Sequence, residues 1–151
     1  MLPLHKYLTI SASLLVWLAS GVPQSQAATP GECPQPRFTA RAPDDYFGRT
    51  IPPAAASMNP QSAKPIFEGK SEAANCAICH GKKGDGKGVL AGQFDPPPRN
   101  FTCARTVKGV PDGQLFWIIR FGSSGTAMPP HAALNDEQVW QLVLYLRQLA
   151  I

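Results

Sequence analysis

The clearest pattern of hydrophobic and polar positions lies at the end of the chain. Apolar side chains recur there at intervals of three and four residues, at Val139, Trp140, Val143, Leu146 and Leu149 or Ala150. This spacing places them on one face of a helix. Asn135 precedes the pattern as a cap, and Gln138 follows three residues later as its partner in a capping box. The sequence therefore predicts a C-terminal helix with one buried face.

Two other segments predict helices. Residues 112–121 carry an apolar face and stop at Gly122, a residue type that often follows a last helical turn. Residues 66–80 contain few helix breakers, whereas residues 81–100 are rich in glycine and proline and predict a loop. No stretch alternates convincingly with a period of two. We therefore expect an all-α domain of three to four short helices over residues 66–151.

The segment before this domain is rich in proline. Residues 28–65, called the arm below, hold eight of the 16 prolines of the chain. Proline fixes φ and removes a backbone donor, so neither a helix nor a central strand can run through this spacing. We predict an extended arm. Its aromatic residues, including Tyr46 and Phe47, favour packing on the domain, and a flexible spacer is the alternative.

Residues 1–27 are typical of a secretory signal peptide. Lys6 precedes an apolar run from residue 8 to residue 22, and the run is followed by a site that a signal peptidase can cleave near Ala27. We expect export to the periplasm, with no membrane span in the mature chain. An uncleaved anchor is the alternative, although the run is shorter than the ~20 residues that a span needs.

Composition and charge narrow the classes of function. With 44% hydrophobic residues, the chain is typical of a globular protein. The net charge of +4 is too small and too scattered to indicate nucleic-acid binding. Four cysteines are too few for a scaffold built on disulfides. We therefore expect a metal, a cofactor or a crosslink to support the small core.

The segment Cys76-Ala77-Ile78-Cys79-His80 is the attachment motif of c-type haem. Residues three apart share a face of a helical turn, so both thiols can add to the vinyl groups of one haem. His80 then faces the iron as the proximal ligand. The alternatives are a thioredoxin-type thiol pair, half of a zinc site and an ordinary disulfide. They are weaker, because no βαβ pattern and no second metal-binding pair accompanies the motif.

The second axial ligand decides between a carrier and a catalyst. Met128 lies in the loop Gly-Thr-Ala-Met-Pro-Pro just before the last helix and is our candidate. His131 is its rival, and Met58 is a poor candidate because it lies in the arm. Methionine and histidine together saturate the iron and suit electron transfer. An open or labile sixth site would instead indicate a haem enzyme or a haem protein that binds small ligands.

Four segments of the chain resemble, in their order and spacing, those of a class I monohaem cytochrome c of the small bacterial type. The matching pieces are residues 76–81, 112–122, 125–130 and 134–149. The resemblance implies the cytochrome c fold around one covalently attached haem c. It also implies that the protein is not itself an enzyme and transfers one electron between redox partner proteins, or serves as the electron-accepting subunit of an exported oxidoreductase.

The resemblance further implies roles for residues around the haem. Trp140 and Tyr145 should pack near the haem and the crossing of the terminal helices. The family often has an aromatic residue where this chain has Glu72, so Phe67 or Ile66 should pack that crossing. The backbone carbonyl of one of the three prolines, Pro96, Pro97 or Pro98, should accept a hydrogen bond from His80. We also expect Arg99 or Asn100 to bind a haem propionate.

Two cysteines and three lysines remain. Cys33 and Cys103 are left over in an exported chain, where spare thiols usually pair, and free buried thiols are the alternative. Lys82, Lys83 and Lys87 form a positive patch beside the haem motif. The patch can steer an acidic redox partner, or it can be an ordinary solvated surface.

Overall fold

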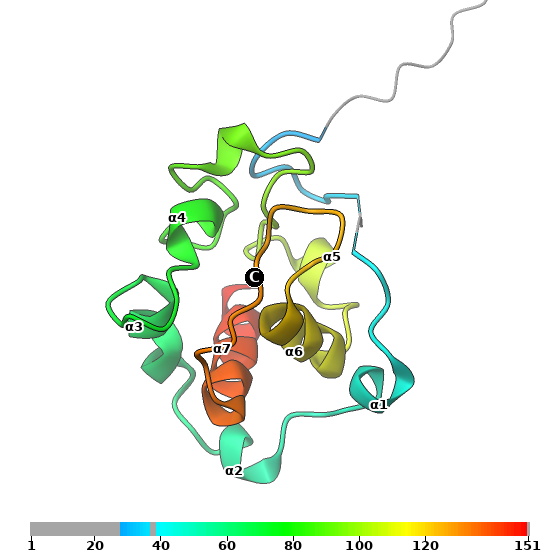
Figure 1. Ribbon diagram of the computed structural model, residues 1–151, viewed down its shortest axis with the longest axis vertical. Helices are drawn as coiled ribbons and strands as arrows, with labels where there is room; N and C mark the ends of the chain where they lie inside the picture. Colours follow the sequence, from blue (N-terminus) through cyan, green and yellow to red (C-terminus); the bar gives the residue numbers. More distant parts are fainter. Residues whose placement is uncertain (1–27, 37–38, 151) are drawn as a thin grey trace, which may run out of the picture.

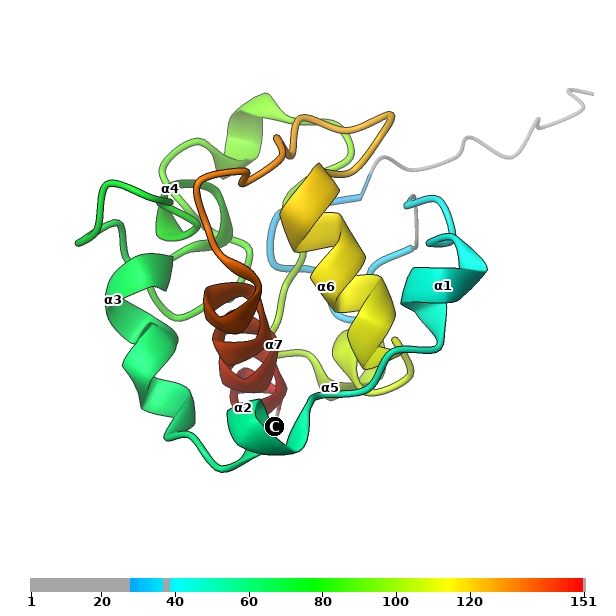
Figure 2. The same cartoon turned by 60° about the horizontal axis from the view of Figure 1, so that its bottom comes forward.

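The computed structural model describes residues 28–36 and 39–150, so the predicted signal peptide lies outside the described part. Within these ranges the regular elements are helices, and the one β-bridge, between Ser71 and Ala74, is isolated. The all-α class is therefore confirmed. None of the helices in these ranges has the length and apolar character needed to cross a membrane. In Figures 1 and 2, α7 lies between α3 on one side and α6 on the other.

The two long helices have the predicted bounds. Helix α6 spans Asp112–Phe121 and ends before Gly122, whose φ is +79°. Helix α7 spans Asp136–Leu149, and the Asn135–Gln138 capping box is present in both directions. The two helices pack through Phe116 and Trp140, whose ring centroids are 4.5 Å apart. The aromatic contact joins the two helices, and the capping box fixes where α7 begins.

The predicted helix over residues 66–80 is wrong. Two single turns replace it, α3 (Lys64–Phe67) and α4 (Ala77–His80). Gly69 has a φ of +75°, and the amides of Gly69 and Lys70 donate to the carbonyls of Ile66 and Pro65. This is a Schellman motif, which ends a helix at a glycine in the left-handed region. The glycine therefore stops α3 and turns the chain before the haem motif.

The arm differs from the extended segment that its prolines predict. It contains α1 (Asp44–Phe47), α2 (Pro53–Ala56) and the 3-10 helix η1 (Pro60–Ala63), and η1 continues into α3. Each of the three helices begins at a proline or directly after one. Proline is tolerated in a first turn, where its missing donor is not needed. The prolines thus limit the helices to one turn and do not prevent them.

The arm packs on the domain at several points. Ala55 and Ala63 are buried in the core. Just after the arm, Phe67 of α3 contacts Tyr145 of α7, with ring centroids 5.3 Å apart. Phe67 thus packs where α3 meets α7, in the role that the sequence predicts for Phe67 or Ile66. Figures 1 and 2 show α1 on the side of α6 that faces away from α7. Helix α1 approaches α6 closely at Gly113, where a Cβ atom would collide with the carbonyl of Tyr46.

Candidate functional site

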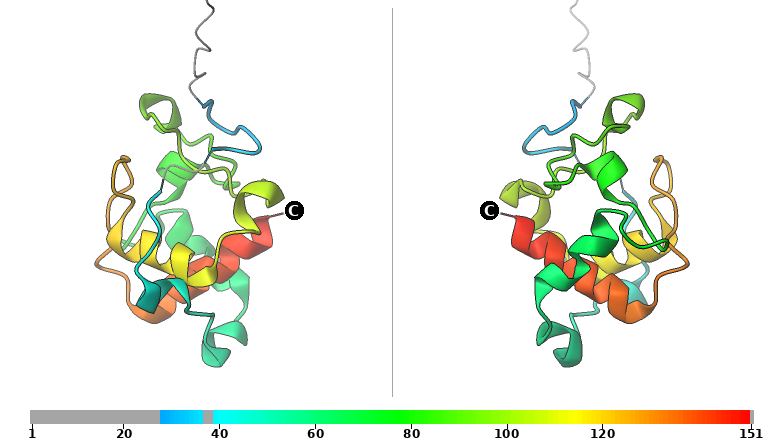
Figure 3. Two further views of the ribbon diagram at one scale, coloured as in Figure 1. Left: turned by 90° about the vertical axis from the view of Figure 1, so that its right-hand side faces the viewer. Right: turned by 90° about the vertical axis from the view of Figure 1, so that its left-hand side faces the viewer.

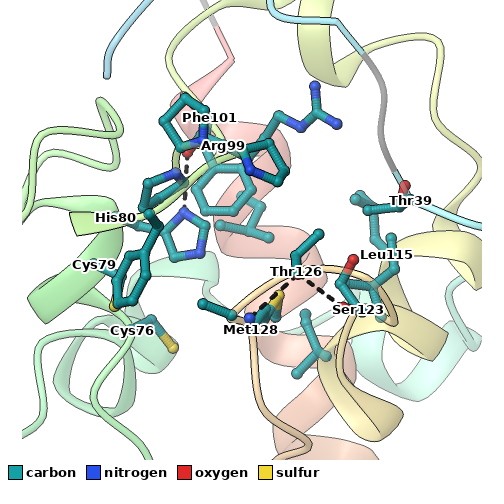
Figure 4. A pocket seen from close by; sticks show the side chains of 18 of the residues that line it. Thr39, Cys76, Cys79, His80, Arg99, Phe101, Leu115, Ser123, Thr126 and Met128 are labelled. Carbon is teal, nitrogen blue, oxygen red and sulfur yellow. Dashed lines mark hydrogen bonds between the residues drawn. The ribbon is translucent and has the colours of Figure 1, made fainter. Parts of the chain in front are cut away.

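A cavity opens between α4, the segment 94–101, α6 and the loop 122–131. Cys76, Cys79 and His80 lie on one side of it, and Met128 lies opposite them on the loop (Figure 4). His131 also contributes to the wall. Apart from a few polar side chains, the lining is aliphatic, aromatic and proline-rich. The structure therefore brings the predicted attachment motif and both candidate sixth ligands to one apolar cavity.

The attachment turn is held by the glycine-rich loop that follows it. Helix α4 is a single turn, in which the amide of His80 donates to the carbonyl of Cys76 at 2.9 Å. Three loop amides donate to its last carbonyls: Gly86 to His80 (2.8 Å), Gly88 to Cys79 (3.0 Å) and Leu90 to Ile78 (3.0 Å). Gly88 lies so close that a Cβ atom there would collide with Ile78 and Cys79. The loop thus satisfies carbonyls that a short helix leaves unpaired.

The two thiols of the motif are free in the polypeptide. Burial raises the pKa of Cys76 to about 11 and also raises the pKa of Cys79. A thioredoxin-type pair needs a lowered thiol pKa, so the environment here opposes that alternative. Across residues 28–36 and 39–150, no three His, Cys, Asp or Glu side chains gather in a group that could hold a metal ion. The zinc alternative therefore lacks a ligand set in this part of the chain.

His80 is buried and oriented by one hydrogen bond. Its Nδ1 lies 3.0 Å from the carbonyl oxygen of Arg99, and the ring of Phe101 stacks on it at 4.5 Å. A carbonyl only accepts, so Nδ1 donates the proton and Nε2 keeps its lone pair. Burial lowers the pKa of His80 to about 4, which keeps the imidazole neutral at pH 7. A neutral ring with a free Nε2 has the chemistry that iron ligation requires.

The expected proline carbonyl is not the acceptor for His80. The carbonyl of Arg99 takes that role, while the carbonyl of Pro98 accepts from the side chain of Gln35 at 3.0 Å. Successive carbonyls of an extended segment point to opposite sides. Because Pro98 points to the arm, Arg99 points to His80. Pro96 and Pro97 line the cavity wall without making this hydrogen bond.

Met128 is held by the loop that carries it. Its amide donates to the hydroxyl of Thr126 at 3.2 Å, and its carbonyl accepts from the amide of Ser123 at 3.1 Å. Gly122 permits a close approach because it lacks a Cβ atom, which would lie 2.8 Å from the Met128 carbonyl oxygen. Met58 lies elsewhere, where its sulfur accepts from Gln141 at 3.0 Å. The loop therefore fixes Met128 at the cavity, and Met58 is not part of the wall.

Two other expectations change. Trp140 does not line the cavity, because it packs against Phe116 between α6 and α7. Asn100 is buried within the polypeptide, where its side-chain amide donates to the carbonyl of Gly31 and its oxygen accepts from Thr102. Arg99 does line the cavity. One of its guanidinium nitrogens donates to the carbonyls of Gln35 and Pro36, at 3.3 and 3.0 Å.

Ser123 is a wall residue that the sequence did not single out. It is 5% exposed, and its hydroxyl has no hydrogen-bond partner among the described residues. An unpaired buried hydroxyl is costly, so this atom fits a cavity filled by a group with polar substituents. The apolar wall, the two thiols, the neutral imidazole and this hydroxyl together fit a covalently attached haem. The sequence could not single out Ser123, because its place on the cavity wall depends on the tertiary structure and not on a local pattern.

Comparisons with known proteins point in the same direction. The family model of cytochrome c matches residues 66–150, more than half of the chain. Among solved structures, a chain of the reducing HAO-like protein complex of Kuenenia stuttgartiensis is similar, with 27% sequence identity and a TM-score of 0.52. The match covers 68% of this chain and 47% of that one, so this chain spans about half the length of its relative. None of the curated proteins matches the chain significantly.

Proposed function

The chain belongs to the cytochrome c family, and we propose that it is a single-electron carrier with His80 and Met128 as its axial iron ligands. It binds covalently attached haem c, and its function is haem-based electron transfer. Cys76 and Cys79 are the two thioether positions of this proposal. The bound haem supplies an iron that alternates between the ferric and ferrous states. The polypeptide binds it, orients the ligands and excludes water.

One observation carries the choice of ligands. The neutral imidazole of His80, with its Nδ1 proton held by the Arg99 carbonyl, lines the same cavity as the thioether of Met128. A saturated iron leaves no position for substrate, so these two ligands favour a carrier over a catalyst. His131 is the remaining competitor for the sixth position on the wall, and ligation by either side chain saturates the iron. Only a native iron with an open sixth position would favour the enzyme alternative.

The ferric absorption spectrum tests the proposal. Thioether-ligated ferric haem gives a weak near-infrared charge-transfer band, which Met128→Ala should abolish. Met58→Ala is the matched control, since the sulfur of Met58 lies outside the cavity and bonds to Gln141. His131→Ala should leave the band unchanged. A native ferric protein in the high-spin state, or loss of the low-spin spectrum only in His131→Ala, would replace this proposal with the open-site or histidine-ligated alternative.

We propose that the protein works in the periplasm, as a carrier or as an electron-accepting subunit of a larger oxidoreductase. A disulfide joins Cys33 and Cys103, and disulfides persist in oxidising compartments. The similar chain from Kuenenia stuttgartiensis belongs to a protein complex, which supports the subunit role. Lys82, Lys83 and Lys87 are exposed, which supports docking of an acidic partner. A reduction rate that is independent of ionic strength would contradict that docking.

A further inference from the structure

The first residues of the arm bind the segment that orients His80. The side-chain oxygen of Gln35 accepts from the amide of Asn100 at 2.6 Å, and its side-chain nitrogen donates to the carbonyl of Pro98 at 3.0 Å. The backbone amide of Gln35 donates to the hydroxyl of Thr106 at 3.3 Å. Gln35 is 9% exposed. A buried side-chain amide thus pairs with the backbone on both sides of Arg99.

This pairing determines where the Arg99 carbonyl points. In an extended segment, the carbonyl of Pro98 and the amide of Asn100 share one side, and the carbonyl of Arg99 lies on the other. Gln35 occupies the first side, so the Arg99 carbonyl meets Nδ1 of His80 at 3.0 Å. Figure 4 shows this carbonyl above the imidazole, with the hydrogen bond marked. The contacts thus run from Gln35 of the arm, through the backbone of Pro98, Arg99 and Asn100, to the imidazole of His80.

We propose that Gln35 is a positioning residue for electron transfer, acting through the Arg99 carbonyl on the hydrogen bond at His80. The inference rests on the proposed role of His80 as an iron ligand. A strong hydrogen bond from Nδ1 makes the imidazole a better electron donor, and this stabilises the ferric state. The arm thereby contributes to the reduction potential of the haem, although it lies before the segment matched by the family model.

The chain offers a matched control for Gln35. Gln114 is also a buried glutamine that binds the arm, with its oxygen accepting from the amide of Ala42 at 2.8 Å and its nitrogen donating to the carbonyl of Ala40 at 3.0 Å. It lies on α6, and its two side-chain hydrogen bonds go to Ala40 and Ala42 rather than to the segment that carries Arg99. The two glutamines make the same type of contact with the backbone, but only Gln35 adjoins the partner of His80.

The experiment compares Gln35→Met with Gln114→Met in the purified holoprotein. Each change keeps the size of the side chain and removes both hydrogen bonds, so both variants should lose stability. Gln35→Met alone should raise the midpoint potential of the haem. It alone should also increase the exchange rate of the His80 Nδ1 proton, observed by NMR, by up to about tenfold. Should Gln35→Met fail to mature, Gln35→Ala tests the same step with a smaller expected shift, because water can enter.

Equal potentials and equal proton exchange in Gln35→Met and the parent protein would overturn the proposal. The same shift in both variants would also overturn it, because a general loss of packing would then be the cause. The wild-type ferric spectrum tests the ligands separately. If His80 is not a ligand, the wild-type protein will lack the low-spin ferric spectrum before any variant is made. A normal wild-type spectrum together with an unchanged midpoint potential in Gln35→Met would reject the positioning role alone.

Discussion

At the scale of single residues, the hydroxyl of Ser123 fits a cavity that holds a group with polar substituents. Its oxygen is buried in the wall and has no partner in the described part of the chain. An unpaired buried hydroxyl costs about 1–3 kcal/mol, and a hydrogen bond to a substituent of the bound haem would remove that cost. Ser71 has a second buried hydroxyl without a partner among these residues, but it does not line the cavity.

We predict different outcomes for the two serines. Ser123→Ala should lower the unfolding free energy of the ferric holoprotein by about 1–2 kcal/mol, because the variant could not make the hydrogen bond that we expect between this hydroxyl and the bound haem. Ser71→Ala should be neutral or slightly stabilising, because it removes a polar atom that has no partner. Guanidinium unfolding followed by the Soret band measures both. Equal midpoints for the two variants would show that Ser123 does not contact the haem.

Residue roles were predictable from the sequence only where the signal is local. Attachment and ligand roles for Cys76, Cys79 and His80 are predicted from five consecutive residues, and the structure brings all three side chains to the cavity. The acceptor for His80 was missed, because the direction of the Arg99 carbonyl is decided by Gln35, which lies 64 residues earlier. Trp140 lies on the predicted buried face, but periodicity does not tell a helix contact from a cavity wall.

At the scale of elements, α4 is too short to be stable as an isolated helix. Forming one turn fixes several residues for a single hydrogen bond, so such a turn needs support from outside. The amides of Gly86, Gly88 and Leu90 supply it. The loop and the attachment turn therefore behave as one unit, which presents both thiols and His80 to the cavity.

We predict that this unit does not tolerate a side chain at Gly88. Gly88→Ala would place a methyl group against the backbone of Ile78 and Cys79, and should lower the unfolding free energy by about 1–3 kcal/mol. Gly92→Ala is the control, because a Cβ atom there meets nothing within 4 Å. Thermal unfolding and the yield of haem-loaded protein measure both. An unchanged Gly88→Ala protein would show that the loop does not support α4.

Helix ends were predictable where capping signals stand next to a periodic pattern. Helix α7 has Asn135 with its reciprocal Gln138, and α6 has Gly122, so both helices were predicted with their correct bounds. The segment 66–80 also contains a stop signal, Gly69, but a glycine inside an apolar stretch is compatible with a continuous helix. Only the structure shows that Gly69 takes a positive φ and ends α3 with a Schellman motif.

At the scale of the whole molecule, the arm wraps around the domain. In Figure 3 its first part starts in blue near the green loops that follow α4, and its teal helix α1 lies beside α6. It then continues through α2 and η1, which pack on α7. Gln35 binds its first part to the His80 side of the cavity, and Gln114 binds a later part to α6. The Cys33–Cys103 disulfide adds a covalent link across 70 residues, with Cα atoms 5.6 Å apart.

We predict that this disulfide contributes substantially to stability. In the chain-entropy model, a closed loop of this length lowers the entropy of the unfolded chain enough to stabilise the fold by about 4 kcal/mol. The double variant Cys33→Ser/Cys103→Ser should lose a large part of this in guanidinium unfolding, and its arm should become sensitive to proteases. Alkylation without reductant, read by mass spectrometry, should find no free Cys33 or Cys103 in the parent protein. Two alkylated residues, or an unchanged unfolding midpoint, would contradict the role of the crosslink in fixing the arm beside His80.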